Sequence, residues 1–495
     1  MKFLERHFKW GRWLIGGILL GLAFVFSWSW FLVFPGLLLL LHSLLKAKDG
    51  REVLWGSFVM GIFLHAGALS WIWYTYPLVW LGLSPGFIQL LLIAVYWLMV
   101  ALVQGIALIP ILFTQWWLFK RYGLIALILF PFMWIMGEIL ASFTFSLYML
   151  GIGSSLNIYF SFGYVGYLVS HLPVLYPVTM VLGVYGLSFT VATISLLGYL
   201  WWSESDKIKA PLLLTTLGGM AMIGGLFVFN DRSVPALATR VIAIDTSFTS
   251  SFLQTDNAYS IKAAALEDSI QTALKYQPDI VLLPEDSRWS RSYQSTAEAL
   301  NAFKIIAPES KALVVDSSRI KTLKGDTVLR AFYYDLGQGA VYVTDKQYLV
   351  PQGEYLPYLM SWLLNRVGNE AVIDKLKDRL SYQPGPMTDY SHFPADVPGT
   401  LFCFESVSTL GVQKLSTNRS SQLILHPTSH AWFHEPEMFW HHLNSMLRVQ
   451  ALWSNKIIVQ AGNEVPGAAY YPNGKIQRGT VVDSGEYWRL VEYNF

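Results

Sequence analysis

The sequence predicts a protein in two parts: a bundle of about seven membrane-spanning α-helices at residues 1–230, and a layered α/β domain at residues 231–495. The first observation is composition, because 54% of the 495 residues are hydrophobic and only 14% are charged, whereas soluble proteins carry about 25% charged residues. The second is that charge is uneven: it makes up about 7% of residues 1–230 but about 19% of residues 231–495. The third is a change from long apolar runs to short β-rich runs near Asn230.

Seven apolar runs occupy the first part. Most reach the roughly 20 residues that a helix needs to cross a bilayer, and so many uninterrupted runs would leave a soluble protein no polar face. The first two are shorter and suit a tight helical hairpin. The runs cover residues 13–26, 31–45, 53–73, 87–119, 124–147, 172–202 and 212–229.

Basic residues fall only in alternate loops of this part. Because Lys and Arg stay on the cytoplasmic side, this pattern predicts a cytoplasmic N-terminus and, after seven spans, an α/β domain on the opposite side of the membrane. The basic residues are Lys2, Arg6, Lys9 and Arg12 before the first run, Lys46, Lys48 and Arg51 after the second, Lys120 and Arg121 after the fourth, and Lys207 and Lys209 after the sixth.

Glu138 is the one acidic residue within an apolar run. A carboxylate inside a membrane is costly and is therefore a hypothesis for a functional site. The alternative is a structural one, in which Glu138 only bonds to a neighbouring helix.

The second part contains eight short β-rich runs, with helical stretches at residues 260–276 and 438–453. This alternation predicts sheets covered by helices. A net charge of +2 gives no support to nucleic-acid binding, and one cysteine, Cys403, excludes an intramolecular disulfide. The expected strands cover residues 241–245, 279–285, 312–318, 331–336, 339–345, 400–406, 421–427 and 456–462.

Three side chains at or near strand ends could form a catalytic set. Glu285 ends an apolar strand, where desolvation would raise its pKa towards that of a useful general base. Lys346 follows a second strand, and Cys403 lies within a third. Each has a plainer explanation: a solvated strand-end Glu, a surface Lys, and a small core Cys.

Four motifs favour the catalytic interpretation: PE at 284–285, DKxxLVPxGEYLP at 345–357, CFES at 403–406 and AWF at 431–433. Their order resembles that of the carbon-nitrogen hydrolase (nitrilase) superfamily. With the membrane part in front, including PxxWxxxE at 131–138, the chain resembles the apolipoprotein N-acyltransferase family.

The resemblance implies a nitrilase-like αββα sandwich with a Glu285–Lys346–Cys403 triad, supported by Glu354, Glu405 and the backbone N–H near Phe404. It implies that an acyl chain moves from a phospholipid, through a thioester on Cys403, to the N-terminal amine of a diacylglyceryl-cysteine lipoprotein, without metal or cofactor. The implied location is the bacterial cytoplasmic (inner) membrane, with the catalytic domain on the extracytoplasmic side.

Some positions depart from the family pattern. They are Gln352, Phe404 and Ser429–His430, and no apolar span is expected after Ile457. These departures leave open an amidase or acyltransferase of the same superfamily with another acceptor. A non-catalytic lipid-binding paralogue is a further alternative, although retention of the triad argues against it.

Two other features call for an interpretation. The apolar stretch at residues 355–364 is too short to cross a bilayer, so Leu359, Met360 and Leu363 either belong to a lid that admits lipid tails or to an ordinary core helix. Five histidines cluster late in the chain, and His430 and His434 have the spacing of a helical metal pair. Pro436 interrupts any helix there, so we expect aromatic packing and no metal. The five are His426, His430, His434, His441 and His442.

Overall fold

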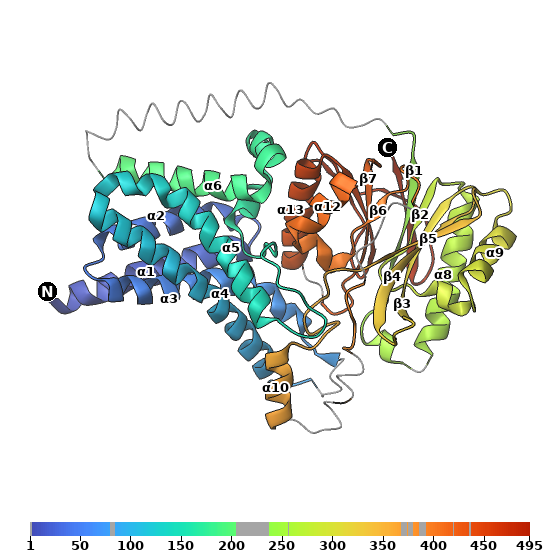
Figure 1. Ribbon diagram of the computed structural model, residues 1–495, viewed down its shortest axis with the longest axis horizontal. Coiled ribbons are helices and arrows are strands. Elements are labelled where there is room, and N and C mark those ends of the chain that lie inside the picture. Colours follow the sequence, from blue (N-terminus) through green and yellow to red (C-terminus); the bar gives the residue numbers. More distant parts are fainter. Residues whose placement is uncertain are drawn as a thin grey trace.

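The computed structural model shows a helical bundle beside an α/β domain (Figure 1). The predicted boundary near Asn230, the seventh apolar run at 212–229 and the basic residues Lys207 and Lys209 lie outside the residues that the structure describes. Those residues are 2–79, 85–203, 237–255, 257–367, 374, 380–385, 393–418, 420–434 and 437–495.

Each of the first six predicted apolar runs contains most of one long helix, and these helices lie side by side (Figure 1). A 3-10 segment, Gly123–Leu129, joins the fourth and fifth helices, and another, Ser70–Thr75, follows the third. The bounds are α1 Lys2–Val25, α2 Val33–Lys46, α3 Gly50–Ala68, α4 Phe87–Tyr122, α5 Phe130–Tyr148 and α6 Tyr176–Trp202.

The predicted count of seven spans is not confirmed. Within the described residues, three helical stretches are long and apolar enough to cross a bilayer: Ser29–Lys46, Phe87–Tyr148 and Pro173–Trp202. The second of these includes both α4 and α5. Helix α1 contributes a shorter apolar stretch, Trp10–Val25.

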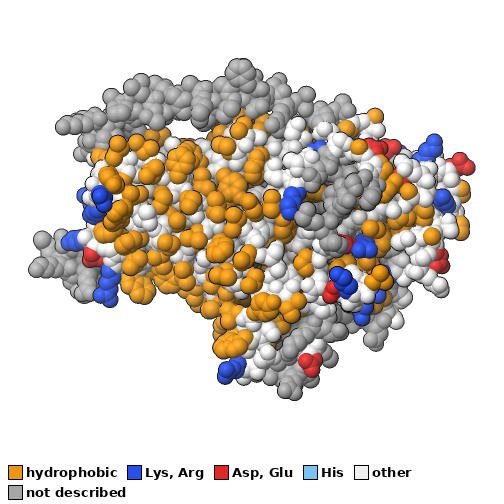
Figure 2. Space-filling view, viewed as in Figure 1, with side chains coloured by type: hydrophobic (Ala, Val, Ile, Leu, Met, Phe, Trp, Pro, Cys, Tyr) orange, Lys and Arg blue, Asp and Glu red, His pale blue; other side chains and the backbone are white. Residues whose placement is uncertain are grey.

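The face of the bundle seen in Figure 2 is largely apolar. Large side chains such as Ile125 and Phe132 are exposed, while Ser57, Gln104 and Glu138 are buried between the helices. This distribution suits a lipid surrounding, because polar groups within a membrane face the protein interior. The bundle is therefore compatible with a membrane protein.

The strands of the second part hydrogen-bond in the order β10-β9-β8-β1-β2-β3-β4-β5, with β12 beside β1 and β7 beside β8. Strands β1 and β8 pair only at one point, Thr246 with Asn463, so the two halves diverge from there. The bounds are β1 Arg240–Thr246, β2 Ile280–Leu282, β3 Leu313–Lys321, β4 Thr327–Asp335, β5 Ala340–Asp345, β6 Gly399–Thr400, β7 Leu423–Ser429, β8 Ile457–Asn463, β9 Ala469–Tyr470, β10 Ile476–Gln477, β11 Thr480–Ser484 and β12 Trp488–Asn494.

Alternate side chains of each strand enter different cores, because successive residues face opposite sides of a sheet. Val241 of β1 and Val459 of β8 share one central core between the two halves. Ile242 instead packs beneath α8 (Ala258–Lys275) and α9 (Thr296–Ile306), and Ile458 beneath α12 (Thr409–Asn418) and α13 (Glu437–Ser454). The layers are therefore helix, sheet, sheet, helix (Figure 1), which is the layered architecture expected from the sequence.

One local expectation was wrong, and one group of strands was missed. The predicted strand at 400–406 is only the short β6, followed by a 3-10 helix that begins at Cys403. Strands β9 to β12 were not predicted at all.

The two parts meet where α13 packs against α6. The ring of Trp453 lies 6.0 Å from that of Tyr185. Gly183 has a φ of 60° within α6, and a Cβ atom there would lie 2.3 Å from the Trp453 ring. A side chain at this position would therefore both strain the backbone and push the two parts apart.

Candidate active site

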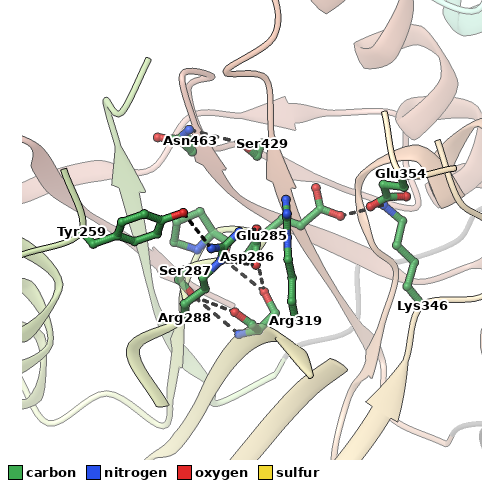
Figure 3. Close-up of polar contacts among 12 residues, drawn as sticks. Tyr259, Glu285, Asp286, Ser287, Arg288, Arg319, Lys346, Glu354, Ser429 and Asn463 are labelled. Atoms are coloured by element: carbon green, nitrogen blue, oxygen red, sulfur yellow. Dashed lines mark hydrogen bonds and ion pairs between the residues drawn. The ribbon is translucent and has the colours of Figure 1, made fainter. Parts of the chain in front are cut away.

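Lys346 is the centre of a buried ionic cluster. Its Nζ donates to Glu285 Oε1 at 2.9 Å and to Glu354 Oε1 at 2.8 Å, and its side chain is 0% exposed (Figure 3). A buried ammonium needs such partners, because an unpaired charge in the interior is costly. The structure thus brings together two of the predicted triad residues and one predicted supporting glutamate.

Glu285 belongs to a turn after β2 that β3 holds in place. Asp286, at a φ of 55°, donates its N–H to Ser317 Oγ at 2.9 Å. Its carboxylate accepts from Arg288 at 2.6 Å and from Arg319 at 2.8 Å. Burial alone would raise the pKa of Asp286, but Arg319 and Arg288 hold it well below its usual range. The residue next to Glu285 is therefore anchored in its charged form (Figure 3).

Glu354 is positioned by the turn that follows β5. Its second oxygen, Oε2, accepts the N–H of Val350 at 2.7 Å, so the side chain bonds both to Lys346 and to its own turn. Gln352, one of the departures from the family pattern, has a φ of 62° in this turn. Glutamine at position 352 is therefore compatible with the contacts of Glu354.

Cys403 is the first residue of the 3-10 helix Cys403–Val407, which we call the nucleophile turn. Its thiol is partly exposed and donates to the carbonyl of Ser429 at 3.8 Å. The turn, rather than the predicted strand, thus carries the thiol at the end of β6.

Glu405 ties the nucleophile turn to the segment that carries Lys346. Its Oε1 accepts the N–H groups of Gln347 at 2.6 Å and Tyr348 at 3.2 Å, and its Oε2 accepts the N–H of Phe402 at 2.8 Å. Burial raises the pKa of this carboxyl. Glu405 has the geometry of a structural brace between the two segments.

The side chains of the three predicted triad residues affect one another electrostatically. Burial raises the pKa of Glu285 to about 7, against the opposing effect of Lys346. Burial, and then the Glu285 carboxylate, raise the pKa of the Cys403 thiol to about 12. For Lys346, burial lowers the pKa, but Glu285 and Glu354 outweigh it and leave the pKa above its ordinary value. At neutral pH the thiol is therefore protonated and needs a nearby base to become a nucleophile.

Phe404 contacts a loop of the bundle that the sequence reasoning missed. Its ring lies 5.4 Å from that of Phe160 and 6.0 Å from that of Phe162. The loop carried no charge or motif that would have assigned it to the site. The one feature of its sequence that could have indicated a contact is the series of aromatic residues between the fifth and sixth predicted apolar runs.

The predicted lid stretch forms helix α10, Tyr358–Val367, attached at its start to the bundle. Tyr358 N donates to the carbonyl of Leu150 at 2.8 Å. Leu359 and Leu363 are 40% and 41% exposed, and Met360 is half-buried, so α10 is not a core helix. Figure 2 shows hydrophobic surface continuing from the bundle towards this helix.

Four of the five clustered histidines form hydrogen bonds within the protein. Burial lowers the pKa of His430 to about 3, and its Nδ1 accepts from Trp440 at 3.0 Å. His434 bonds to the carbonyl of Pro77, and His442 to that of Phe24. Among the described residues, no group of three or more His, Cys, Asp or Glu side chains has the arrangement of a metal site.

Comparison with known proteins gives matches to both parts. Residues 16–197 match the model of the apolipoprotein N-acyltransferase N-terminal domain. A protein named apolipoprotein N-acyltransferase from Geobacter metallireducens is 24% identical over 473 residues, covering 91% of this chain and 82% of that protein. Another of that name, from Pasteurella multocida, is 23% identical over 457 residues, covering 87% and 79%. Among solved structures, an amidase from Nesterenkonia sp. is 15% identical, covering 53% of this chain and 92% of its own, with a TM-score of 0.35. Over most of its length the chain is thus similar to proteins named apolipoprotein N-acyltransferase, and residues 16–197 match the model of that family's N-terminal domain.

Proposed function

We propose that this protein transfers an acyl chain from a phospholipid to the N-terminal α-amine of a diacylglyceryl-cysteine lipoprotein, through a thioester on Cys403. The observation that supports the proposal is the ion pair between Lys346 and Glu285, at 2.9 Å, with the Cys403 thiol of a third segment near enough for both charges to affect its pKa. The names of the curated relatives support the choice of acceptor, an apolipoprotein amine.

In the first step, Glu285 takes the thiol proton as Cys403 Sγ attacks the carbonyl of the phospholipid ester. The C–S bond forms, the ester C–O bond breaks, and the lysophospholipid leaves with the proton that Glu285 returns. The Lys346 ammonium and the N–H of Phe404 stabilise the oxyanion. Because the resting thiol has a pKa of about 12, a base that accepts its proton during attack matters more here than a preformed thiolate.

In the second step, the lipoprotein amine attacks the thioester. Glu285 takes a proton from the amine, the C–N bond forms and the C–S bond breaks, and the proton returns to the sulfur. Glu285 thus accepts and returns one proton in each half-reaction, for which a pKa of about 7 is well suited. Neither step requires a metal or a cofactor.

We place the protein in a bacterial cytoplasmic membrane, with the N-terminus inside and the α/β domain on the extracytoplasmic side. Figure 2 shows Lys and Arg side chains at the end of the bundle farthest from the α/β domain, with hydrophobic surface between. The side with the basic loops is the cytoplasmic one by the usual rule. The extracytoplasmic side is also where the proposed lipoprotein substrate would carry its lipid-modified N-terminus.

The test is to trap the thioester. Purified protein in detergent micelles is incubated with a phospholipid labelled in its acyl chain, and hydroxylamine-sensitive label is located by mass spectrometry of the Cys403 peptide. A diacylglyceryl-cysteinyl peptide is then added, and should discharge the label as an N-acyl product. Cys403→Ala is the control and should take up no label.

The outcomes separate the alternatives. Absence of a thioester in the wild-type protein would reject both enzymatic hypotheses and favour a lipid-binding paralogue. A thioester that forms but is not discharged by the lipopeptide would favour an amidase or acyltransferase with another acceptor. A thioester that the lipopeptide discharges supports the proposal as stated.

Acylation should depend on pH through Glu285. Only the ionised carboxylate can accept the thiol proton, and its fraction rises with pH around the pKa of about 7. The initial rate of labelling at saturating donor should therefore increase about tenfold between roughly pH 6 and pH 8. The measurement is the rate of label uptake in buffers of constant ionic strength, and a rate that is flat or falls across this range would contradict the assignment of Glu285.

Helix α10 should matter for lipid donors. Replacing Leu359, Met360 and Leu363 by Ser removes apolar surface at the side where lipid tails would enter, and should slow acylation by a long-chain phospholipid about tenfold. A short-chain, water-soluble ester should be affected little. Val481→Ser, at an exposed apolar residue on β11, is the matched control. An equal loss with both esters would rule out the lid.

A further inference from the structure

Glu138 lies in the middle of α5, is only 4% exposed, and bonds to a loop rather than to another charged group. Its Oε1 accepts the N–H of Val165 at 2.8 Å and the indole N–H of Trp134 at 3.2 Å. Val165 begins a 3-10 helix, Val165–Val169, whose N-cap residue makes no side-chain capping bond. The carboxylate therefore supplies an acceptor to the first N–H of this helix, which would otherwise be unsatisfied within the bundle.

Two further side chains attach the same loop, residues 157–169, to the bundle. We call it the docking loop. Ser142, one turn after Glu138 on α5, donates to the carbonyl of Phe160 and contacts the Tyr164 hydroxyl at 2.9 Å. Ser188 of α6 accepts the N–H of Gly166 at 3.0 Å. The loop is thus held at Phe160, Tyr164 and Gly166 by polar groups of two helices.

The opposite side of the docking loop carries the nucleophile turn and the residues just after it. Ser161 N donates to the carbonyl of Val407 at 3.1 Å, and Thr409 N donates to the carbonyl of Tyr159 at 3.2 Å. These are backbone bonds, so they set the position of the main chain only a few residues from the thiol. The rings of Phe160 and Phe162 add the contact with Phe404, the neighbour of Cys403.

We propose that Glu138 is a positioning residue for the Cys403 nucleophile, acting through the docking loop. The carboxylate fixes Val165, the loop fixes residues 404–409, and these set where the thiol lies relative to Glu285 and Lys346. This rests on the proposed function only in taking Cys403 as the nucleophile. Glu138 belongs to the helical bundle, whereas the reacting groups belong to the α/β domain. The carboxylate would therefore help to arrange these groups from across the interface between the two parts.

Because Cys403 is the only cysteine of the chain, its alkylation reports on the nucleophile turn without any substrate. Glu138→Met keeps the size of the side chain but removes the acceptor, whereas Glu138→Gln keeps an oxygen that can accept from Val165 N. In the Met variant the partly exposed thiol should become more accessible, move away from the Glu285 carboxylate that helps to raise its pKa, and react with iodoacetamide about tenfold faster. The Gln variant should react at the wild-type rate.

Acyl transfer should change in the opposite direction. In Glu138→Met the maximal rate of Cys403 acylation should fall roughly 10- to 100-fold while the half-saturating donor concentration stays the same, because misplaced reacting atoms lower the rate of the chemical step. The Gln variant should retain most of the rate. Glu52→Met, which removes another buried carboxylate of the bundle, at the start of α3, is the control for general destabilisation and should change neither rate.

The outcomes are distinguishable from failure of the proposed function. If wild-type protein forms no thioester, the alkylation rates still decide whether Glu138 positions the thiol. If Glu138→Met does not accumulate as folded protein, Ser142→Ala tests the same loop with a smaller change and should raise alkylation about threefold. Wild-type alkylation and acylation in Glu138→Met, or equal changes in the Glu52→Met control, would overturn the proposal.

Discussion

Lys346→Met is expected to abolish detectable acylation of Cys403 and to lower the free energy of unfolding by about 3–5 kcal/mol. The lysine side chain is 0% exposed and is bonded to two carboxylates, so its removal leaves Glu285 and Glu354 facing each other without a cation. The oxyanion also loses its ammonium partner. Stability is measured by thermal or denaturant unfolding in detergent, and acylation by label uptake.

The loss of stability in Lys346→Met should depend on pH in a definite direction. Without Lys346, the pKa of Glu285 in the folded state should rise further above its unfolded value, so folding favours the protonated form. The deficit in the free energy of unfolding relative to wild type should be smallest below about pH 7, where Glu285 is largely protonated in both folded proteins, and should grow as the pH rises above that value. Glu285→Gln in the Lys346→Met background should recover part of the stability but no activity. Lys456→Met, at a buried lysine that donates to the carbonyl of Ser421, is the matched control and should retain activity. A Lys346→Met protein as stable and active as wild type would refute the ionic cluster.

Glu285→Gln is expected to slow acylation of Cys403 about 10²- to 10⁴-fold, the usual contribution of a general base. The amide can still accept from Lys346 Nζ but cannot take the thiol proton, so the fold should be kept while the chemistry is lost. Single-turnover labelling with excess phospholipid measures the chemical step directly.

Glu354→Gln is the discriminating control for this variant. It makes the same change of charge beside Lys346, since both carboxylates bond to the same Nζ atom. If Glu285 acts as the base and Glu354 only as a brace, the Glu354→Gln loss should be much smaller. Equal losses would mean that charge around Lys346, and not proton transfer, determines the rate.

The sequence was sufficient for the features that depend on local composition. Uninterrupted apolar runs predicted the helices of the bundle, because a segment without a polar face must be buried or surrounded by lipid. The apolar runs before Glu285 and Lys346 predicted that both residues lie at strand ends. The order of the motifs predicted that the two belong to one catalytic site. The structure describes helices for six runs and places both side chains in one cluster.

The sequence was insufficient where tertiary contacts decide local structure. TLFCFES is apolar enough for a strand, yet Glu405 folds back to accept the N–H of Phe402, and the chain turns at Cys403. Strands β9 and β10 have two residues each and exist only through pairing with one another and with β8. By contrast, the partial alternation in WRLVEYN could have revealed β12. The bond from Glu138 to Val165 joins positions 27 residues apart and has no sequence pattern.

The docking loop limits where the α/β domain can be separated from the helical bundle. Val407 is 3% exposed and packs, with Phe404, into the hydrophobic core of the bundle rather than that of the α/β domain. An α/β domain cut free at residue 237 would present this apolar patch to water, a few residues from Cys403. Exchange of the bundle for that of a distant relative would meet the same obstacle unless residues 157–169 were carried along. The unit that can be transplanted is therefore the α/β domain together with this loop.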